Sequence, residues 1–391
     1  METLLKHIVI VGGGPSGCMA AISCKTHHPE VKVTLIEGND RLGVKLRLTG
    51  GGRCNLTANV SSDEIIKHTP RNGRFLYSSL DQFNVHDIMD FFTSRGLSLK
   101  EEDHHRIFPK SDKADDVVLV LENELKKLDV NIKYKTRVIS VNSEDKKLIT
   151  DHSEISFDHL ILAMGGCTYP QTGSDKHGFE LIESLGHTIS ELKPAEVPLV
   201  SNASIIQSKE LQGLSFKDVS ITSYINDKKI VSVTHDLLFT HFGLSGPGAL
   251  QTSSYLTDAF KDDNKVHLVI DFLPMVKQDE IPIKDNEALL QSYGIPKRLI
   301  QVFKTQFPHN DLVQLIKQFK IELHGTRGFT TAFVTSGGVN LKEIDPKTLK
   351  SKKHPWLSIC GESLDVNSLT GGYNMTVAFT TGYSAGKNID D

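Results

Sequence analysis

Residues 8–37 alternate between apolar runs and a segment of small residues. Residues 8–11 (Ile-Val-Ile-Val) form a continuous apolar run, which is typical of a strand buried in a parallel sheet. Small and apolar residues fill 18–25, as expected of a helix packed closely on a sheet. A second apolar run over 31–36 ends at Glu37. The pattern therefore predicts a β-α-β unit in which one helix covers two parallel strands.

Downstream, apolar positions recur first with helical spacing and then with strand spacing. Within residues 63–95, short stretches have apolar residues at helical spacing, most clearly over 86–95. Apolar residues three and four apart predict an amphipathic helix over 115–128. Short strands are expected at 131–134, 137–141 and 148–149, and a buried strand at 158–163 that leads into two glycines.

The pattern changes near Pro194. Residues 197–272 show the alternation typical of strands, and helices are expected over 298–307 and 311–323. After Gly325 the chain is strand-like again and then rich in glycine. We therefore expect three domains, listed by their ranges: a discontinuous nucleotide-binding domain (1–192 and 350–391), a β-rich insert (193–275 and 326–349) and a small helical subdomain (276–325).

The composition is that of an ordinary soluble chain without an excess of basic residues. The 391 residues include 44 Lys and Arg against 48 Asp and Glu, a formal charge of −4. A nucleic-acid partner is not expected, since phosphate contacts supply much of that affinity. No apolar run approaches the ~20 residues that cross a bilayer, and no signal peptide is recognised. We therefore expect a cytoplasmic protein that does not contact membranes.

Cysteine and histidine usage gives no metal or disulfide framework. The five cysteines are odd in number, widely spaced and without a C-x-x-C pair, which favours reduced thiols in the cytoplasm. His104 and His105 are adjacent and have no third ligand close by in the sequence, so they indicate a solvated loop. No metal site is predicted.

The turn after the first strand carries the pattern Gly12-x-Gly14-x-x-Gly17. In such a turn the first glycine permits tight folding, the second lets the backbone approach a diphosphate, and the third lets helix and strand pack closely. Glu37, placed at the end of the second strand, would accept hydrogen bonds from a ribose and repel a 2′-phosphate, which argues against NADP. These spacings predict a dinucleotide site; the alternative is a glycine turn in an unrelated α/β protein.

Further glycine-rich segments favour FAD over NAD. A triple glycine within 49–55 would let the backbone approach a flat ring or a phosphate, although a flexible loop would look the same. The strand ending at 163–166 returns the chain toward the first glycine turn. FAD is long and usually takes contacts from both ends of a chain, so the second cluster of glycines near the C-terminus matters.

That C-terminal cluster covers residues 361–365 and 370–374. It precedes a helix-like segment, 375–387, whose N-terminus could stabilise an anionic flavin edge or a phosphate. Asp365 could bind ribityl hydroxyls. Glycine caps between ordinary elements remain the alternative here.

Together these segments resemble the YhiN/BaiN-like flavoproteins, also described as the aminoacetone oxidase family of FAD-binding enzymes. The resemblance covers nearly the whole chain and rests on 12–17, 49–55, 165–174, 239–247 and 361–374, in this order. It implies an α/β fold: a Rossmann-like FAD-binding domain of the two-dinucleotide-binding type, with an inserted β-barrel-like domain and a small helical subdomain. It also implies tightly bound FAD.

Motifs and resemblance give the candidate cofactor-binding residues. They are Gly12, Gly14, Pro15, Ser16, Gly17, Glu37, Gly38, Gly51, Gly52, Arg53, Cys54, Asn55, Val138, Gly165, Gly166, Gly361, Glu362, Asp365, Gly372, Tyr373 and Asn374. Tyr373, His241 and Tyr169 are weak catalytic candidates, and each also fits a structural role. Cys54 is expected to pack near the isoalloxazine.

The resemblance implies either oxidation of small amines or reduction of unsaturated steroid acids. Neither a second G-x-G-x-x-G nor a cysteine close to Cys54 is present, which argues against a disulfide reductase with its own NAD(P)H domain. We expect an oxidase that converts a small amine such as aminoacetone to methylglyoxal, ammonia and hydrogen peroxide. The alternatives are a C=C reductase driven by a transient NAD(P)H donor and, from another class, a flavin-containing RNA-modification or RNA-binding protein.

Overall fold

The computed structural model describes residues 5–261, 263–278, 281 and 287–390. The chain forms two compact units, which we call unit 1 (Met1–Lys193 with Val334–Asp391) and unit 2 (Pro194–Phe333). The predicted domain ranges also include 1–4, 262, 279–280, 282–286 and 391, which lie outside the described residues.

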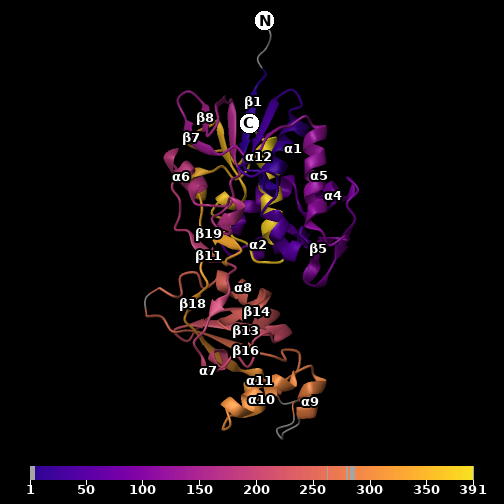
Figure 1. The fold of residues 1–391 in the computed structure, drawn as a ribbon, viewed down its shortest axis with the longest axis vertical. Coiled ribbons are helices and arrows are strands. Elements are labelled where there is room, and N and C mark those ends of the chain that lie inside the picture. Colours follow the sequence, from indigo (N-terminus) through magenta and orange to yellow (C-terminus); the bar gives the residue numbers. More distant parts are fainter. Residues whose placement is uncertain (1–4, 262, 279–280, 282–286, 391) are drawn as a thin grey trace. The chain divides into compact units, whose positions relative to one another are not determined.

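A five-stranded parallel sheet forms the centre of unit 1 (Figure 1). Its strands, in spatial order, are β20 (Leu357–Ile359), β10 (His159–Leu162), β1 (His7–Val11), β2 (Lys32–Ile36) and β6 (Asn131–Lys133). Residues 8–10 have no exposed surface, because helices cover both faces of a parallel sheet. The predicted β-α-β unit is confirmed.

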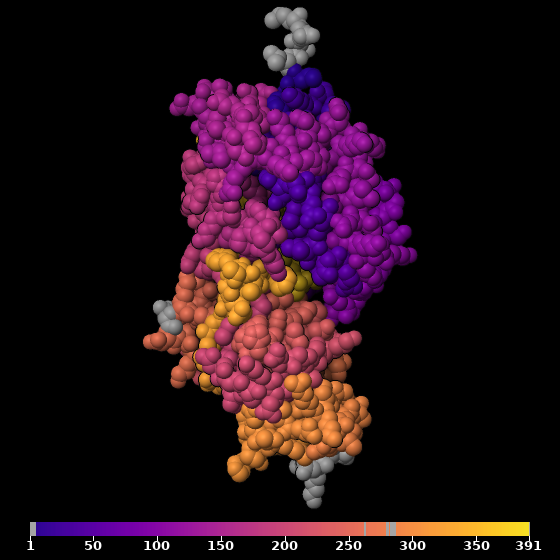
Figure 2. All heavy atoms as spheres, viewed as in Figure 1, coloured from indigo at the N-terminus to yellow at the C-terminus, as the bar shows by residue number. Residues whose placement is uncertain are grey.

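Helix α1 (Pro15–His27) packs closely on α12 (Tyr373–Lys387), the last helix of the chain. A Cβ added at Gly382 would lie 2.2 Å from the Ser16 carbonyl oxygen, and one added at Gly386 would lie 2.1 Å from the Ala20 carbonyl oxygen. Only glycine permits this approach. In the space-filling view, the yellow of α12 is almost covered by indigo and purple residues (Figure 2).

The other elements of unit 1 surround this centre. The helices are α2 (Ser62–Lys67), α3 (Tyr77–Gln82), α4 (Val85–Thr93), α5 (Ala114–Lys127) and α6 (His177–Ser184). One antiparallel sheet has the order β3 (Thr57–Ala58), β5 (Arg106–Pro109), β4 (Leu99–Glu101), and another the order β7 (Val138–Asn142), β8 (Lys147–Thr150), β9 (Glu154–Ser156). Strand β19 (Val334–Ser336) begins the return segment, and β11 (Lys193–Ala195) crosses the unit boundary.

Unit 2 is built on a seven-stranded antiparallel sheet. Its spatial order is β17 (Phe319–Leu323), β16 (Val266–Asp271), β13 (Ser215–Ile225), β14 (Lys228–Phe239), β15 (Gly243–Ser245), β12 (Leu199–Val200) and β18 (Gly325–Thr326). The helices are α7 (Ser204–Gln207), α8 (Pro247–Ser254), α9 (Glu287–Ser292), α10 (Lys297–Gln306) and α11 (Leu312–Lys317).

The helix predicted over 311–323 is wrong in its second half. Helix α11 ends at Lys317, and Phe319–Leu323 forms β17, an edge strand paired with β16. Phe319, Ile321 and Leu323 are buried while the residues between them are exposed, a period of two that sheet pairing satisfies. The rings of Phe303 in α10 and Phe319 lie 4.9 Å apart, so the helices share their core with the sheet.

The chain returns to unit 1 at Val334, earlier than the boundary at 350 expected from the sequence. Val339 explains the early return. It bridges Ile189 on one side and Leu364 on the other, and is fully buried. The glycines at 337 and 338 allow this close approach: a Cβ at Gly338 would lie 2.6 Å from the backbone of Leu364.

Candidate functional site

The turn between β1 and α1 has the geometry that each glycine of the pattern requires. Gly12 has φ +109°, and a Cβ there would lie 2.4 Å from the Ala163 carbonyl oxygen. A Cβ at Gly17 would lie 1.8 Å from the Gly12 carbonyl oxygen. A Cβ at Gly14, by contrast, would have no heavy atom of the described residues within 4 Å. The turn is therefore tight at two glycines and open at the third, in front of the α1 N-terminus, where Pro15 begins the helix.

Glu37 is fixed beside this turn. Its Oε2 accepts a hydrogen bond from the Gly13 backbone N–H at 2.7 Å, and its Oε1 accepts from the Asn39 backbone at 2.8 Å and side chain at 2.7 Å. A carboxylate offers about four acceptor sites, so Oε2 keeps one for a ligand hydroxyl. Gly38 follows with open space around it. The sequence pattern gave no signal for Asn39, since its role depends on the fold of the 37–39 turn.

The C-terminal glycine cluster meets the N-terminal turn. Gly361 has φ +72°, and a Cβ there would lie 2.3 Å from Ser16 Oγ. Ser363 Oγ donates to the Gly165 carbonyl at 3.0 Å. The structure thus brings Ser16, Gly165 and Gly361, predicted separately from three parts of the chain, to one edge of the sheet.

Glu362 is held by groups that the sequence did not indicate. Lys45 Nζ lies 2.8 Å from its Oε2, and the Thr335 backbone N–H donates to its Oε1 at 2.9 Å. Gly166 packs against the same carboxylate, where a Cβ would lie 2.6 Å from Oε1. Lys45 also donates to Thr168 Oγ1 at 2.9 Å. This ion pair ties four separate segments together beside the glycine turn.

Asp365 is buried and paired with Arg71. The guanidinium binds both carboxylate oxygens: Nη2 donates to Oδ2 at 2.9 Å, and Nε donates to Oδ1. The Asn72 side chain donates to the Asp365 carbonyl at 2.7 Å. Such two-point binding fixes the orientation of the carboxylate. Arg71 lacks a local motif and could not be recognised from the sequence.

The Gly-Gly-Gly-Arg-Cys-Asn segment contains both open and buried positions. Gly51 has φ +68°, and an added Cβ would meet no atom of the described chain within 4 Å; Gly52 also has a positive φ, +89°. Arg53 pairs with Glu102 at 2.9 Å, and its guanidinium lies 4.1 Å from the centre of the Phe108 ring. Its charge is therefore already engaged by the β4–β5 side of unit 1.

Cys54 and Asn55 differ sharply in their polar environment. Cys54 is fully buried, and burial raises the pKa of its thiol to about 12, which keeps it protonated and unreactive. Asn55 Oδ1 is buried and has no hydrogen-bond partner within the described part of the chain. Buried acceptors are almost always paired, so this oxygen fits an acceptor for a bound group.

The start of α12 is braced against β3. A Cβ at Gly372 would lie 2.4 Å from the Thr57 carbonyl oxygen. The Tyr373 ring stacks on His68 with centres 4.6 Å apart, and burial raises the pKa of its phenol. The Asn374 amide is satisfied within its own loop, accepting from Ser368 N at 3.1 Å and donating to Ser368 O at 2.8 Å.

The three remaining candidates are Tyr169, Val138 and His241. Burial raises the pKa of Tyr169 as well, so its phenol is also held neutral. Val138 begins β7, and its carbonyl accepts a hydrogen bond from His177 at 2.8 Å. His241 belongs to unit 2, where it is exposed and contacts the edge of Phe242.

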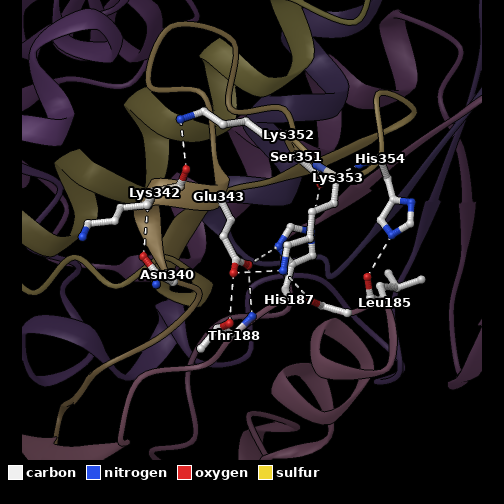
Figure 3. A network of polar contacts seen from close by, with 11 residues as sticks. Leu185, His187, Thr188, Asn340, Lys342, Glu343, Ser351, Lys352, Lys353 and His354 are labelled. Carbon is white, nitrogen blue, oxygen red and sulfur yellow. Dashed lines mark hydrogen bonds and ion pairs between the residues drawn. The ribbon is translucent and has the colours of Figure 1, made fainter.

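A second polar network, built around His187, supports the return segment (Figure 3). His187 Nδ1 lies 2.9 Å from Glu343 Oε2, and its Nε2 lies 2.9 Å from Ser351 Oγ. This order resembles a hydrolytic triad. The His187 side chain has 0% exposure, however, and Ser351 Oγ already accepts from the backbone N–H groups of Lys353 and His354. The network is therefore structural.

Glu343 makes this network strongly charged. Partial burial opposes ionisation, yet hydrogen bonds from Lys353, Thr188 and His187 hold the pKa of Glu343 at about 2. Burial lowers the pKa of His187, which stays neutral and donates to the carboxylate. The Asn340 backbone N–H donates to the Thr188 carbonyl, next to the bridge between Ile189 and Val339. The network therefore holds the segment around Val339, which in turn bridges Leu364.

One group of possible metal ligands occurs among the described residues. His28, Glu30 and Asp390 have possible ligand atoms within 4.8 Å of one another, but Lys6 already pairs with Asp390. Within the described part of the chain, every helix is too short or too polar to span a bilayer.

Comparison with known proteins places the whole chain in one family. The family model for the HI0933-like protein Rossmann domain matches residues 6–388. A 3-dehydro-bile acid delta(4,6)-reductase from Clostridium scindens is 31% identical over 98% of both chains. A ribosomal RNA dihydrouridine synthase from Escherichia coli is 28% identical over 97% of both. These matches confirm the family resemblance found in the sequence.

Solved structures show the same fold at low identity. A 3-ketosteroid-delta4-(5alpha)-dehydrogenase from Rhodococcus jostii covers 99% of this chain and 98% of its own, with 14% identity and a TM-score of 0.53. An E. coli quinol fumarate reductase covers 99% of this chain and 70% of its own, with 15% identity and a TM-score of 0.52. The predicted fold class is thereby confirmed.

Proposed function

The chain belongs to the HI0933-like Rossmann-domain family, and from this premise we propose that it is an FAD-dependent oxidoreductase that reduces a carbon–carbon double bond conjugated with a carbonyl. The observation that carries the cofactor is the glycine turn, which is closed at Gly12 and Gly17 and open at Gly14. The names of two relatives support the reaction: one is named a delta(4,6)-reductase, and the other a dihydrouridine synthase.

The residues of unit 1 fit FAD. The open backbone at Gly14 and the α1 N-terminus would hold the diphosphate, since unpaired N–H groups and the helix dipole favour anions there. The free acceptor site of Glu37 would take a ribose hydroxyl. The unpartnered Asn55 Oδ1 and the α12 N-terminus would face donors and partial charges of the isoalloxazine end.

The cofactor, when bound, supplies hydride transfer, and the protein supplies position and protons. Reduction of a conjugated double bond needs one hydride and one proton. Tyr373 is our candidate proton donor, because it begins α12, the helix assigned to the isoalloxazine end, and a tyrosine phenol is protonated at neutral pH. His68, stacked on the ring at 4.6 Å, fixes its orientation. Cys54 is too weakly acidic to act as a nucleophile.

The amine oxidase expected from the sequence stays a prediction, and the named relatives favour the reductase alternative over it. RNA is a second substrate candidate, because two relatives are named for ribosomal RNA. The formal charge of −4 argues for the small-molecule substrate, since RNA affinity depends on basic surface.

The decisive experiment compares the rates at which candidate substrates reoxidise the reduced flavin or reduce the oxidised flavin. The purified protein is reduced anaerobically and mixed in turn with a 3-keto-4,6-diene, a uridine-containing RNA fragment and air, and flavin absorbance is followed. We expect the dienone to reoxidise the flavin much faster than air. Rapid reduction of the oxidised protein by aminoacetone, followed by peroxide release in air, would establish the oxidase instead.

A further inference from the structure

Asn367 has a buried side-chain oxygen without a partner. The residue is 1% exposed, and its Oδ1 has no hydrogen-bond partner among the described residues. Its backbone N–H donates to the Arg71 carbonyl at 3.3 Å, which fixes the residue in the interior of unit 1. Leaving a carbonyl oxygen buried and unpaired costs about 1–3 kcal/mol, so a native protein keeps one only where a donor arrives.

The polar side chains on either side of Asn367 are all paired within the protein. Asp365 binds Arg71 at 2.9 Å, and Ser368 Oγ lies 2.7 Å from Thr69 Oγ1. Asn374 is satisfied by the backbone of Ser368. The unpaired oxygen is therefore not a sign of a loosely packed loop. It is one acceptor left open in a segment whose other polar groups are bonded.

The segment that carries Asn367 joins the two ends of the candidate site. At its start, Gly361 approaches Ser16 of the α1 N-terminus; at its end, Gly372 packs on Thr57, close in sequence to Asn55. Asn55 Oδ1 is also buried and unpartnered. Two open acceptors thus occur in the two segments assigned to the isoalloxazine end.

We propose that Asn367 Oδ1 accepts a hydrogen bond from the imide N–H of the FAD isoalloxazine. The inference rests on the proposed function and adds a cofactor-binding residue that the motifs did not indicate. The imide offers the one N–H of the oxidised ring system, and an amide oxygen can meet it without burying a charge beside the ring.

The test separates a ligand contact from a structural contact. Asn367→Leu removes the acceptor, Asn367→Asp keeps an acceptor, and Asn388→Leu is the matched control. Asn388 is also buried, but its side chain donates to Gln82 at 2.9 Å and Ser384 at 2.8 Å. In FAD-free protein, Asn367→Leu should leave the unfolding midpoint unchanged or raise it, because no bond is lost. Asn388→Leu should lower it.

Bound FAD labelled with ¹⁵N at the imide provides the direct measurement. We expect the ¹⁵N resonance to shift in Asn367→Leu, to return toward the wild-type position in Asn367→Asp, and to stay unchanged in Asn388→Leu. FAD affinity should fall about tenfold in Asn367→Leu, the loss of one buried hydrogen bond. An unchanged resonance in Asn367→Leu, with FAD still bound, would overturn this inference alone. Failure of the wild-type protein to bind FAD would overturn the proposed function and this inference together.

Discussion

Substitution of Gly14 by alanine should separate folding from cofactor binding. Gly14 is the residue before α1, with φ −79° and ψ −177°, a conformation that alanine also adopts. A Cβ there meets no heavy atom of the residues that the structure describes within 4 Å, so the FAD-free fold has room for it. Loss of glycine's extra freedom in the unfolded chain and a slightly poorer helix cap nearly cancel. The free energy of unfolding should change by less than about 1 kcal/mol.

The same methyl group should interfere with FAD. It would occupy the space where the diphosphate approaches the backbone, and displacing the diphosphate would weaken at least one charge-assisted hydrogen bond. Such a bond contributes about 1.5–3 kcal/mol, so a loss of about 2 kcal/mol, or about 30-fold in affinity, is expected. FAD-free protein would be prepared in mild denaturant and refolded, its unfolding measured by urea, and its affinity measured by flavin fluorescence.

Gly17 provides the contrasting variant. A Cβ there would lie 1.8 Å from the Gly12 carbonyl oxygen, so Gly17→Ala should destabilise the FAD-free protein itself, by more than about 3 kcal/mol. A role of Gly14 in diphosphate approach would be refuted if Gly14→Ala bound FAD as tightly as wild type. It would also be refuted if the two variants lost stability equally, because the geometry assigns packing to one glycine and ligand approach to the other.

Three other perturbations test the surrounding structure. The pKa of Glu343 is about 2 in the folded state against 4.5 when unfolded, and burial lowers the pKa of folded His187 below 6.5. The unfolded chain therefore binds more protons in acid, so the free energy of unfolding should be highest above pH 6.5 and should fall as the pH is lowered. Glu343 should account for at most about 3 kcal/mol of this loss as the pH falls from 4.5 toward 2, and Glu343→Gln should flatten the urea-derived profile; an identical profile in the variant would contradict this. Arg71→Lys should cost about 1–3 kcal/mol in urea unfolding because Asp365 loses two-point binding, whereas unchanged stability would show that the pair is not required. All five cysteines are buried, so a thiol reagent should label none in the native protein and five after unfolding, and rapid labelling of Cys54 in native protein would disprove its burial.

The sequence predicted those parts of unit 1 whose cause is local. The β-α-β unit follows from apolar runs and a glycine turn within residues 8–37, and the tight packing at Gly12 and Gly17 follows from their spacing. The helical half of 311–323 was also recognised. The second half differs because Ile316, Phe319 and Leu323 recur three and four positions apart, as in a helix, while Phe319, Ile321 and Leu323 also alternate as in a strand. Pairing with β16 decides between the two patterns.

The partners of the site carboxylates could not be predicted, because they arise from distant parts of the chain. Lys45 reaches Glu362 across 317 positions, and Arg71 reaches Asp365 across 294. No motif links such residues. The His187 network is of the same kind, since Glu343 lies 156 positions away. Motif spacing can thus indicate an acidic residue at the site, but it does not indicate which cation or N–H group binds its carboxylate.

These partners change what the predicted acids can do. Glu37, Glu362 and Asp365 were expected to bind the cofactor directly, yet each already accepts two or three hydrogen bonds from the protein. An ionised carboxylate has about four acceptor sites, so one or two remain on each. The acids are therefore oriented before a ligand arrives, and a ligand would not have to order them on binding. These carboxylate side chains lose their rotamer entropy during folding and not during ligand binding. This favours tight binding of a cofactor by a site assembled from both ends of the chain.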